Sequence, residues 1–198
     1  MRLGALTALW RSHHTRPGSA SVLFFLLGAT LGTALDALHA YGDVESYANP
    51  VIGRLGWFVP LEFGLAGLVA GVTVPALDRR LAGHTLAWPL ADRFRELALI
   101  VALYATTVIA NGWGAGLIAV AFVALLVLRL ARSRAPGDWA FALVAGLAGP
   151  AVEAAIHAVG AFDYSEPDLL GIPIWLPALW ANGGIVIRRL FAPLTVAE

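Results

Sequence analysis

The stretch Phe94–Arg129, FRELALIVALYATTVIANGWGAGLIAVAFVALLVLR, decides the fold that this sequence predicts. Apolar residues fill it almost without a break, and its only turn signal is Asn111-Gly112-Trp113-Gly114. A helix needs about 20 largely apolar residues to cross a bilayer. The stretch is therefore predicted to form two membrane-spanning helices, Phe94–Asn111 and Gly112–Arg129, joined by a very short loop.

Four further apolar runs of similar length flank this hairpin, at Ala20–Ala40, Trp57–Leu77, Trp139–Gly160 and Ile174–Phe191. Apolar residues make up 59% of the 198-residue chain and charged residues only 13%, whereas soluble domains carry roughly 25% charged residues. Glycine pairs at helical spacing favour close helix packing in a membrane, and they occur at Gly28 and Gly32, Gly67 and Gly71, Gly112 and Gly116, and Gly146 and Gly149. We therefore predict an all-α, polytopic membrane bundle of six transmembrane helices.

The arginines predict how this bundle is oriented. All 13 basic residues are arginine, and only Arg54 falls on the face whose loops carry the acids Asp43, Glu45, Asp163, Glu166 and Asp168. Because cytoplasmic loops are rich in arginine and lysine, both termini are expected in the cytoplasm. Residues 1–19 and 192–198 are then cytoplasmic segments around a membrane domain at 20–191. The absence of lysine suggests a GC-rich bacterial coding bias, so the expected location is a bacterial inner membrane.

Several classes of function are excluded or disfavoured by composition. The chain has no cysteine, which excludes disulfides, thiolate metal sites and cysteine nucleophiles. Its formal net charge is zero, so nothing indicates a nucleic-acid partner. It contains no Walker loop, dinucleotide-binding glycine fingerprint, G-x-S-x-G elbow or H-E-x-x-H helix. We expect a non-enzymatic protein with no catalytic residue, no cofactor and no bound metal.

Ionisable residues inside the predicted spans are the candidate functional residues, because burying them in a membrane is costly. They are Asp36, His39, Glu62, Glu153 and His157. Asp36 and His39 lie three residues apart and Glu153 and His157 four apart, so each pair shares a helix face. Three interpretations stay open: a structural polar network, the polar end of a lipid-binding cavity, and a metal or proton-relay site.

Two segments of the chain resemble the Insig (insulin-induced gene) family. The first is Trp57-Phe58-Val59-Pro60 with Gly64, Gly71, Pro75 and Asp78 after it. The second, without gaps, runs from Tyr164-Ser165-Glu166-Pro167-Asp168 through Trp175-Leu176-Pro177 to Gly183-Gly184. Together with Arg132-Ser133-Arg134, the likeness extends in order over roughly residues 19–189.

The resemblance implies six membrane helices with cytosolic ends, which agrees with the arginine pattern. Eukaryotic members of the family bind oxysterols within the bundle, retain the escort protein Scap and help to deliver HMG-CoA reductase for degradation. Asp168 stands where the family has an aspartate tied to Scap binding, and the segments around Trp57 and Asn111 match pocket-forming helices. Where eukaryotic members have Pro-Cys-Cys, this chain has Leu61-Glu62-Phe63, which places a carboxylate near the expected pocket.

The function we expect is therefore binding of a neutral lipid, such as a sterol or a diacylglycerol, in a cavity inside the membrane. The expected ligand-binding residues are Asp36, His39, Glu62, Gly64, Gly67, Asn111, Glu153 and His157, and Asp168 is the expected contact for a partner. One alternative is a scaffold that docks another membrane protein, and a second is a small membrane enzyme or proton-coupled carrier. Small-residue helix faces also permit a homo-oligomer.

Overall fold

The computed structural model describes residues 17–82 and 88–191. Most of the expected N-terminal segment, with Arg2, Arg11 and Arg16, and the expected tail 192–198 lie outside the described residues. The described chain is mostly helical and forms six continuous helices. The first comprises α2 (Pro17–Leu27), the π-helical turn η1 (Gly28–Gly32) and α3 (Thr33–Tyr41), and the others are α4 (Val59–Ala82), α5 (Leu90–Ile109), α6 (Ala115–Arg132), α7 (Pro136–Ala158) and α8 (Leu176–Phe191).

These helices match the six apolar runs of the sequence to within a few residues. The predicted hairpin is α5 and α6, and its turn places Gly112 and Gly114 at positive φ angles of 86° and 99°, which glycine adopts without strain. Four helices are long and apolar enough to cross a membrane, at Ser21–Tyr41, Val59–Leu81, Ala115–Arg132 and Pro136–Ala158. The other two differ for simple reasons: α5 starts among charged residues, and α8 is only 16 residues long.

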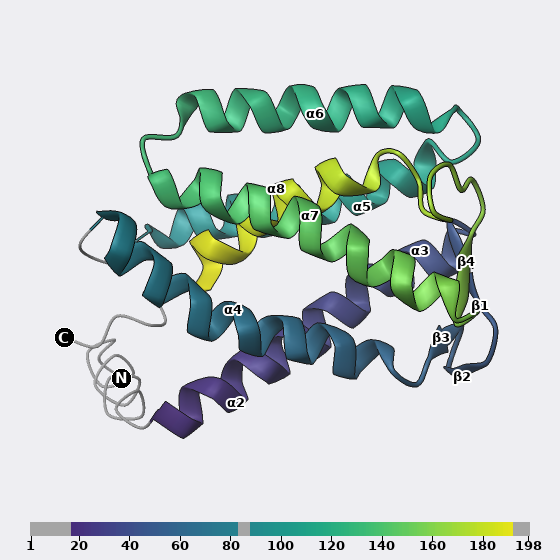
Figure 1. Cartoon of the computed structure of the whole chain (residues 1–198), viewed down its shortest axis with the longest axis horizontal. Helices are drawn as coiled ribbons and strands as arrows, with labels where there is room; N and C mark the ends of the chain where they lie inside the picture. The colour runs from purple at the N-terminus through teal and green to yellow at the C-terminus, as the bar shows by residue number, and fades with distance from the viewer. Residues whose placement is uncertain (1–16, 83–87, 192–198) are drawn as a thin grey trace, which may run out of the picture.

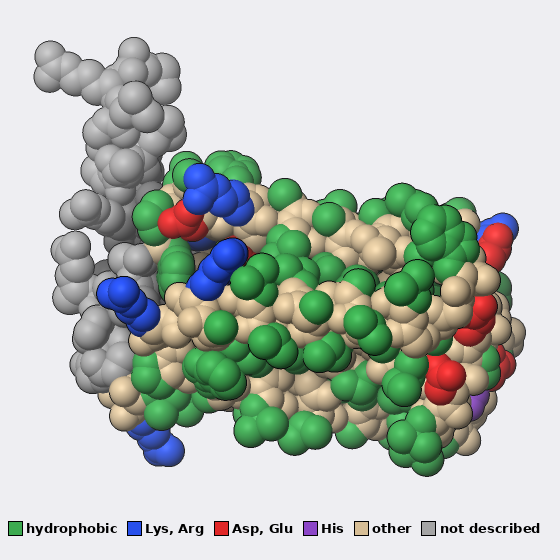
Figure 2. Space-filling view, turned by 90° about the horizontal axis from the view of Figure 1, so that it is seen from above, with side chains coloured by type: hydrophobic (Ala, Val, Ile, Leu, Met, Phe, Trp, Pro, Cys, Tyr) green, Lys and Arg blue, Asp and Glu red, His purple; other side chains and the backbone are tan. Residues whose placement is uncertain are grey.

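The helices run along the long axis of the molecule (Figure 1), with the start of α2 and the end of α8 at one end and the strands at the other. We call these the arginine end and the strand end. Figure 2 shows arginines gathered at the first and most acidic side chains at the second. Large apolar side chains between them face outward, among them Val72, Val120 and Leu147. A belt of exposed apolar side chains between two charged ends is the surface expected of a protein that sits in a bilayer.

Short strands at the strand end are a feature that the all-α prediction did not include. β1 (Glu45–Tyr47) pairs antiparallel with β4 (Phe162–Tyr164), so that Glu45 lies opposite Tyr164. A second pair joins β2 (Pro50–Ile52) and β3 (Leu55–Gly56). Side chains of a strand alternate between its two faces, and β4 accordingly buries Phe162 and Tyr164 while Asp163 is exposed. The β1–β4 pair therefore directs Glu45 and Tyr164 inward, between the helix ends.

Close glycine contacts hold the first helix against α4. A Cβ atom added to Gly28 would collide with the backbone carbonyl oxygen of Phe63, and one added to Gly67 would collide with that of Phe24. Gly149 packs equally closely on the ring of Trp180. The predicted pair Gly112 and Gly116 does not pack in this way, because neither has a neighbour within 4 Å of an added Cβ. Gly112 instead serves the turn.

The variant Gly28→Ala is expected to lower the stability of the protein by about 1–3 kcal/mol, because overpacking forces the two backbones apart. Gly116→Ala is the matched control. It adds a methyl group to a helix at an open position, where alanine is favoured over glycine by about 0.8–1 kcal/mol. Thermal unfolding of both variants in one detergent tests this contrast. Equal melting temperatures for Gly28→Ala and the unmodified protein would contradict it.

A buried ionic network holds the arginine end together. The guanidinium of Arg188, fully buried, donates to Asp78 Oδ1 on α4 at 2.8 Å and to Asp138 Oδ1 on α7 at 2.6 Å. Arg189 donates to the second oxygen of Asp138 and to Glu96 on α5, each at 2.5 Å. Adjacent arginines of α8 thus connect three other helices.

The network extends to α6 through Arg129. Its guanidinium donates to Glu96 and also to the side-chain oxygen of Asn182 at 3.0 Å. The amide nitrogen of Asn182 in turn donates to the carbonyl of Phe122 at 3.2 Å. The arginines from which we predicted the membrane orientation therefore also link the five helices α4, α5, α6, α7 and α8 to one another.

Candidate functional site

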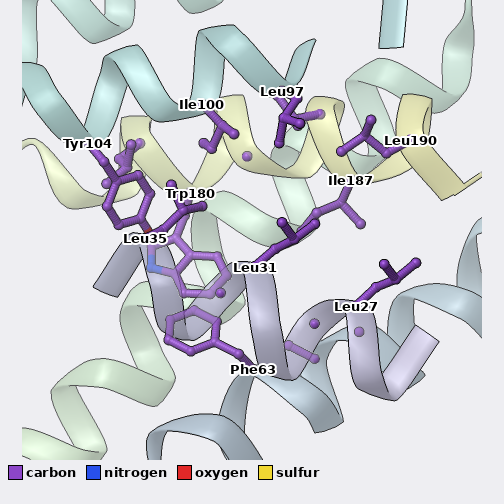
Figure 3. Close-up of a pocket in the computed structure, with 17 residues that line it drawn as sticks. Leu27, Leu31, Leu35, Phe63, Leu97, Ile100, Tyr104, Trp180, Ile187 and Leu190 are labelled. Carbon is purple, nitrogen blue, oxygen red and sulfur yellow. The ribbon is translucent and has the colours of Figure 1, made fainter. Parts of the chain in front are cut away.

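An apolar groove runs between two layers of the bundle. One wall is the first helix with α4, and the other is α5 with α8 (Figure 3). The first helix contributes Leu27, Leu31 and Leu35, and α8 contributes Gly183, Val186, Ile187 and Leu190. The π-helical turn η1 lies in the first wall; such turns occur frequently at functional sites.

The size of the groove suits part of a lipid. Its cavity volume is about 120 Å³, which is below the roughly 300–1,000 Å³ of common small-molecule sites. An occupant would therefore lie partly between the helices and partly in the surrounding medium.

Tyr104 and Trp180 line the groove toward the strand end (Figure 3), and the ring of each carries one polar atom. The indole N–H of Trp180 donates to Glu153 Oε1 at 2.5 Å, and Glu153 also accepts a hydrogen bond from the hydroxyl of Tyr164. Trp180 therefore presents a carbon face to the groove and its N–H to a carboxylate behind it. Aromatic rings with one polar edge suit such a boundary.

His39 is fixed next to Tyr104. Its ring stacks on that of Tyr104 with centroids 4.4 Å apart, and its Nε2 lies 2.8 Å from Thr107 Oγ1. The hydroxyl of Thr107 already donates to the carbonyl of Tyr104 at 2.7 Å. Because that hydroxyl has one hydrogen, its oxygen accepts from His39, and the histidine hydrogen is therefore on Nε2.

Behind Trp180 lies a cluster of acidic and phenolic side chains, which we call the carboxyl cluster: Asp36, Glu45, Tyr47, Glu62, Glu153 and Tyr164. The hydroxyl of Tyr47 donates to Asp36 and lies 3.3 Å from Glu45 Oε1. Glu62 lies within electrostatic reach of Asp36. The strand residues supply the hydroxyl donors and the helix residues supply most of the carboxyl acceptors.

Burial and like charge both act on the strand residues of the carboxyl cluster. Burial raises the pKa of Glu45 well above its ordinary value, and the neighbouring Asp36 and Glu153 raise it further. Burial also raises the pKa of Tyr47 and of Tyr164, each beside acidic groups that reinforce the shift. The two phenols stay protonated and act as hydrogen-bond donors, and Glu45 favours its neutral form.

The raised pKa of Glu45 predicts that stability falls as pH rises. Between the unfolded pKa, near 4.5, and the higher folded pKa, the folded protein holds one proton more than the unfolded chain. This extra proton stabilises the folded protein fully at pH values below the unfolded pKa. The stabilisation is lost as the pH rises through the folded pKa, by up to about 1.4 kcal/mol per pH unit. Glu45→Gln removes the titration, so its unfolding should depend less on pH and it should be more stable at neutral pH. Thermal unfolding from pH 5 to 8 checks this, and an unchanged pH slope in the variant would refute it.

The structure divides the sequence-predicted ligand residues into three sets. Asp36, Glu62 and Glu153 belong to the carboxyl cluster, with His39 beside it, and Gly67 lines the groove. Gly64 packs on the ring of Phe25, and Asn111 donates to the Asp43 carbonyl at 3.0 Å and accepts from Ser165. His157 lies at the strand end, where its Nδ1 is 3.2 Å from Asp163. Of the eight predicted ligand residues, Gly67 alone is part of the groove lining.

The hydrogen bonds within the carboxyl cluster fit the interpretation of a structural polar network. Its position next to the groove fits the interpretation of a polar end of a lipid-binding cavity. Within residues 17–82 and 88–191, no group of three or more His, Cys, Asp or Glu side chains is placed to hold a metal. The residues missed by the sequence reasoning are Glu45, Tyr47, Tyr164 and Trp180. Alternation of apolar and polar residues in Phe162-Asp163-Tyr164 was a usable strand signal, and Trp180 lies inside the predicted span Ile174–Phe191, away from its ends.

Asp168 lies in the exposed loop that follows β4. Its Oδ2 accepts the backbone N–H of Ile174 at 2.8 Å and so closes the loop on itself. The next two side chains, Leu169 and Leu170, are 70% and 73% exposed, and Leu170 has a φ of 56°. Positive φ is strained for leucine. The loop therefore exposes Leu169 and Leu170 at a cost in backbone strain at Leu170.

Comparison with known proteins agrees with this geometry. A family model described as "Protein of unknown function (DUF2878)" matches residues 96–194. The Insulin-induced gene 1 protein of Danio rerio is 26% identical over 202 residues, which cover 98% of this chain and 78% of that protein. The corresponding protein of Gallus gallus is 27% identical over 194 residues, covering 94% and 75%.

Two crystal structures share the fold. They are those of the mycobacterial Insig homologue MvINS from Mycobacterium vanbaalenii, at 23% identity, and of a cross-linked MvINS trimer, at 24%. Each superposes with a TM-score of 0.73 over 89% of this chain and 94% of the other. The apolar helices and these relatives make the chain a multi-pass integral membrane protein. It belongs to the family described as DUF2878 and is a homologue of the Insig proteins.

Proposed function

We propose that this protein binds a neutral lipid in the groove between the first helix, α4, α5 and α8, and that it catalyses no reaction. All six helices cross a bacterial inner membrane in this proposal, with the arginine end in the cytoplasm. The observation that carries it is the groove itself: its lining is almost entirely apolar, and its polar atoms are confined to the part near Tyr104 and Trp180.

The chemistry around the groove favours a neutral ligand with a small polar head. The groove lining contains no cationic side chain, and the carboxyl cluster behind Trp180 would repel a phosphate. The Tyr104 hydroxyl has no hydrogen-bond partner among the described residues, so it is available to a hydroxyl or an ester of the ligand. A sterol or a diacylglycerol has such a head and a bulky apolar body.

Selection of the ligand rests on shape and on this polar end. Transfer of hydrocarbon from bilayer to groove gains little, since lipid tails are as apolar as leucine. The narrow groove and the close contact between Gly28 and Gly67 limit the width of the occupant. The resemblance to Insig proteins, whose eukaryotic members bind oxysterols, supports a lipid with this outline. The cross-linked trimer of MvINS supports self-association as a further property.

The lipid carried by the purified protein tests the proposal. Protein extracted in a mild detergent and washed extensively should retain a neutral lipid near one equivalent, identified by mass spectrometry of the organic extract. That lipid should be enriched over its share of the membrane from which the protein came. Bulk phospholipids in bulk proportions, with no enriched neutral species, would reject the proposal.

A second candidate function is docking of another membrane protein, and the loop around Asp168 favours it. Leu169 and Leu170 stand exposed beside Asp168, and exposed apolar pairs with a charged neighbour suit protein contacts. Cross-linking in native membranes separates this from lipid binding. A defined partner that is lost when both leucines become serine, with the bound lipid unchanged, would support docking.

A further inference from the structure

The arginine end contains a second pocket, which is lined mainly by charged side chains, whereas the groove is lined mainly by apolar ones. We call it the arginine basin; it lies between α5, α6 and α8 and is lined by Arg95, Arg129, Arg132, Arg134 and Arg189, with Trp88, Ser133, Asp92 and Glu96. Five guanidiniums therefore face two carboxylates. Its volume is about 810 Å³, which is large enough for a hydrated headgroup.

The floor and the rim of the basin differ in how their charges are paired. Arg129 and Arg189 form the floor and are held by Glu96 in the ionic network. Arg95 pairs at the rim with Asp92 at 2.8 Å. Arg132 and Arg134 are exposed and have no ion pair with any acidic residue in the described ranges. The basin thus keeps two arginines that are unpaired among the described residues, Arg132 and Arg134, above a floor whose arginines are paired with carboxylates.

Arg189 is held in one position at the floor of the basin. Its Nε is buried and lacks an acceptor among residues 17–82 and 88–191, and its guanidinium carbon lies 4.6 Å from the ring centroid of Trp88. Stacking on Trp88 and two ion pairs keep this side chain in one position. A fixed guanidinium with two exposed ones nearby suits a tetrahedral anion, because guanidiniums bind phosphate oxygens through paired N–H donors.

The surroundings of the basin favour a lipid over a soluble anion. Leu90 and Phe94 of α5 are 61% and 63% exposed, and Val127 of α6 is 60% exposed. These side chains begin the apolar belt directly beside the basin lining. An anion in the basin is therefore within reach of acyl chains on the outer surfaces of α5 and α6.

We propose that the arginine basin binds the phosphate of an anionic phospholipid headgroup, at the end of the protein opposite to the carboxyl cluster. The protein then carries two lipid sites of different chemistry. The groove takes a neutral lipid, and the basin takes a phosphate-bearing one. The basin does not depend on occupancy of the groove, because the two linings share no residue.

Calorimetric titration of the full chain in a neutral detergent tests the basin. The probes are dihexanoyl phosphatidylglycerol, dihexanoylglycerol, which lacks the phosphate, and inorganic phosphate. The double variant Arg132→Gln/Arg134→Gln should bind the phosphatidylglycerol about 30-fold more weakly, the factor expected for two arginines near an anionic headgroup. The control Arg79→Gln/Arg80→Gln removes the same charge from exposed positions at the same end outside the basin and should bind as the unmodified protein does.

Each other outcome of this titration overturns the proposal. Equal losses in the two double variants would show attraction to general surface charge and no site. Inorganic phosphate that binds as tightly as the phosphatidylglycerol, with the same dependence on Arg132 and Arg134, would assign the basin to a soluble phosphate. Dihexanoylglycerol is expected to bind only in the groove, so a loss of its binding in Arg132→Gln/Arg134→Gln equal to that of the phosphatidylglycerol would exclude recognition of the phosphate. Thermal unfolding of both double variants confirms that they fold.

Discussion

The variant Gly183→Leu is expected to lose the bound neutral lipid while keeping the fold. Gly183 of α8 lines the groove, and a Cβ atom added to it meets only Ile100 Cδ1, at 3.8 Å. A leucine side chain would therefore grow into the open space without forcing any backbone to move. Leucine is also a better helix former than glycine. Lipid and leucine then compete for the same space, and overpacking of about 1–3 kcal/mol corresponds to a loss of roughly 5- to 150-fold in affinity.

The control for this experiment is Gly116→Leu. Gly116 is exposed on α6 and has nothing within 4 Å of an added Cβ, so the variant adds the same side chain to the outer surface. Mass spectrometry of lipid retained by the three purified proteins, at equal protein amounts, gives the comparison. Gly183→Leu should retain far less neutral lipid than the other two. Undiminished retention would place the lipid somewhere other than the groove.

The variant Arg188→Met is expected to destabilise the protein more than any other single change considered. Methionine keeps an unbranched apolar side chain that replaces the aliphatic part of arginine, but it leaves Asp78 and Asp138, each about 1% exposed or less, without their cation. Loss of one partner from a buried ion pair costs about 3–5 kcal/mol, because an uncompensated charge remains. Thermal unfolding in detergent measures the loss, and Arg80→Met is the control, since Arg80 is exposed.

A second substitution separates buried charge from lost packing. In Arg188→Met/Asp78→Asn the uncompensated carboxylate of Asp78 is gone, while Asp138 keeps its contacts with Arg189 at 2.5 Å and with Ser133 at 2.6 Å. The double variant should therefore recover about half of the lost stability. No recovery would mean that the guanidinium stabilises the bundle mainly by filling space.

The helices were predictable from sequence because a bilayer imposes length and composition on them. The hairpin at Asn111–Gly114 was visible for the same reason: polar and glycine residues interrupt an otherwise continuous run. The strands were harder to predict, since β1 and β4 have three residues each and pair across most of the chain. Their pairing depends on where the first helix and α7 end, which no local pattern records.

The candidate site was predictable only in its polar part. Charged residues such as Asp36 and Glu153 stand out within apolar helices, and the structure places both in the carboxyl cluster. The groove walls could not be recognised in the sequence, because leucine and isoleucine residues such as Leu31 and Ile187 also occur at positions that face lipid. The partners of Arg188 were equally hidden: arginine near a span end predicts orientation, whereas its pairing with Asp78 and Asp138 depends on how distant helices pack.

Photo-crosslinking of the reconstituted protein tests the central claim, a neutral lipid held in the groove, most directly. A diacylglycerol and a sterol, each with a photoreactive group in the apolar body, are added in trace amounts to nanodiscs, and adducts are mapped by mass spectrometry. We predict adducts of at least one probe on groove residues such as Leu31, Ile100 and Ile187, suppressed by an excess of the same unlabelled lipid. Adducts confined to outward-facing residues such as Val120 and Leu147, and unaffected by that excess, would contradict the claim.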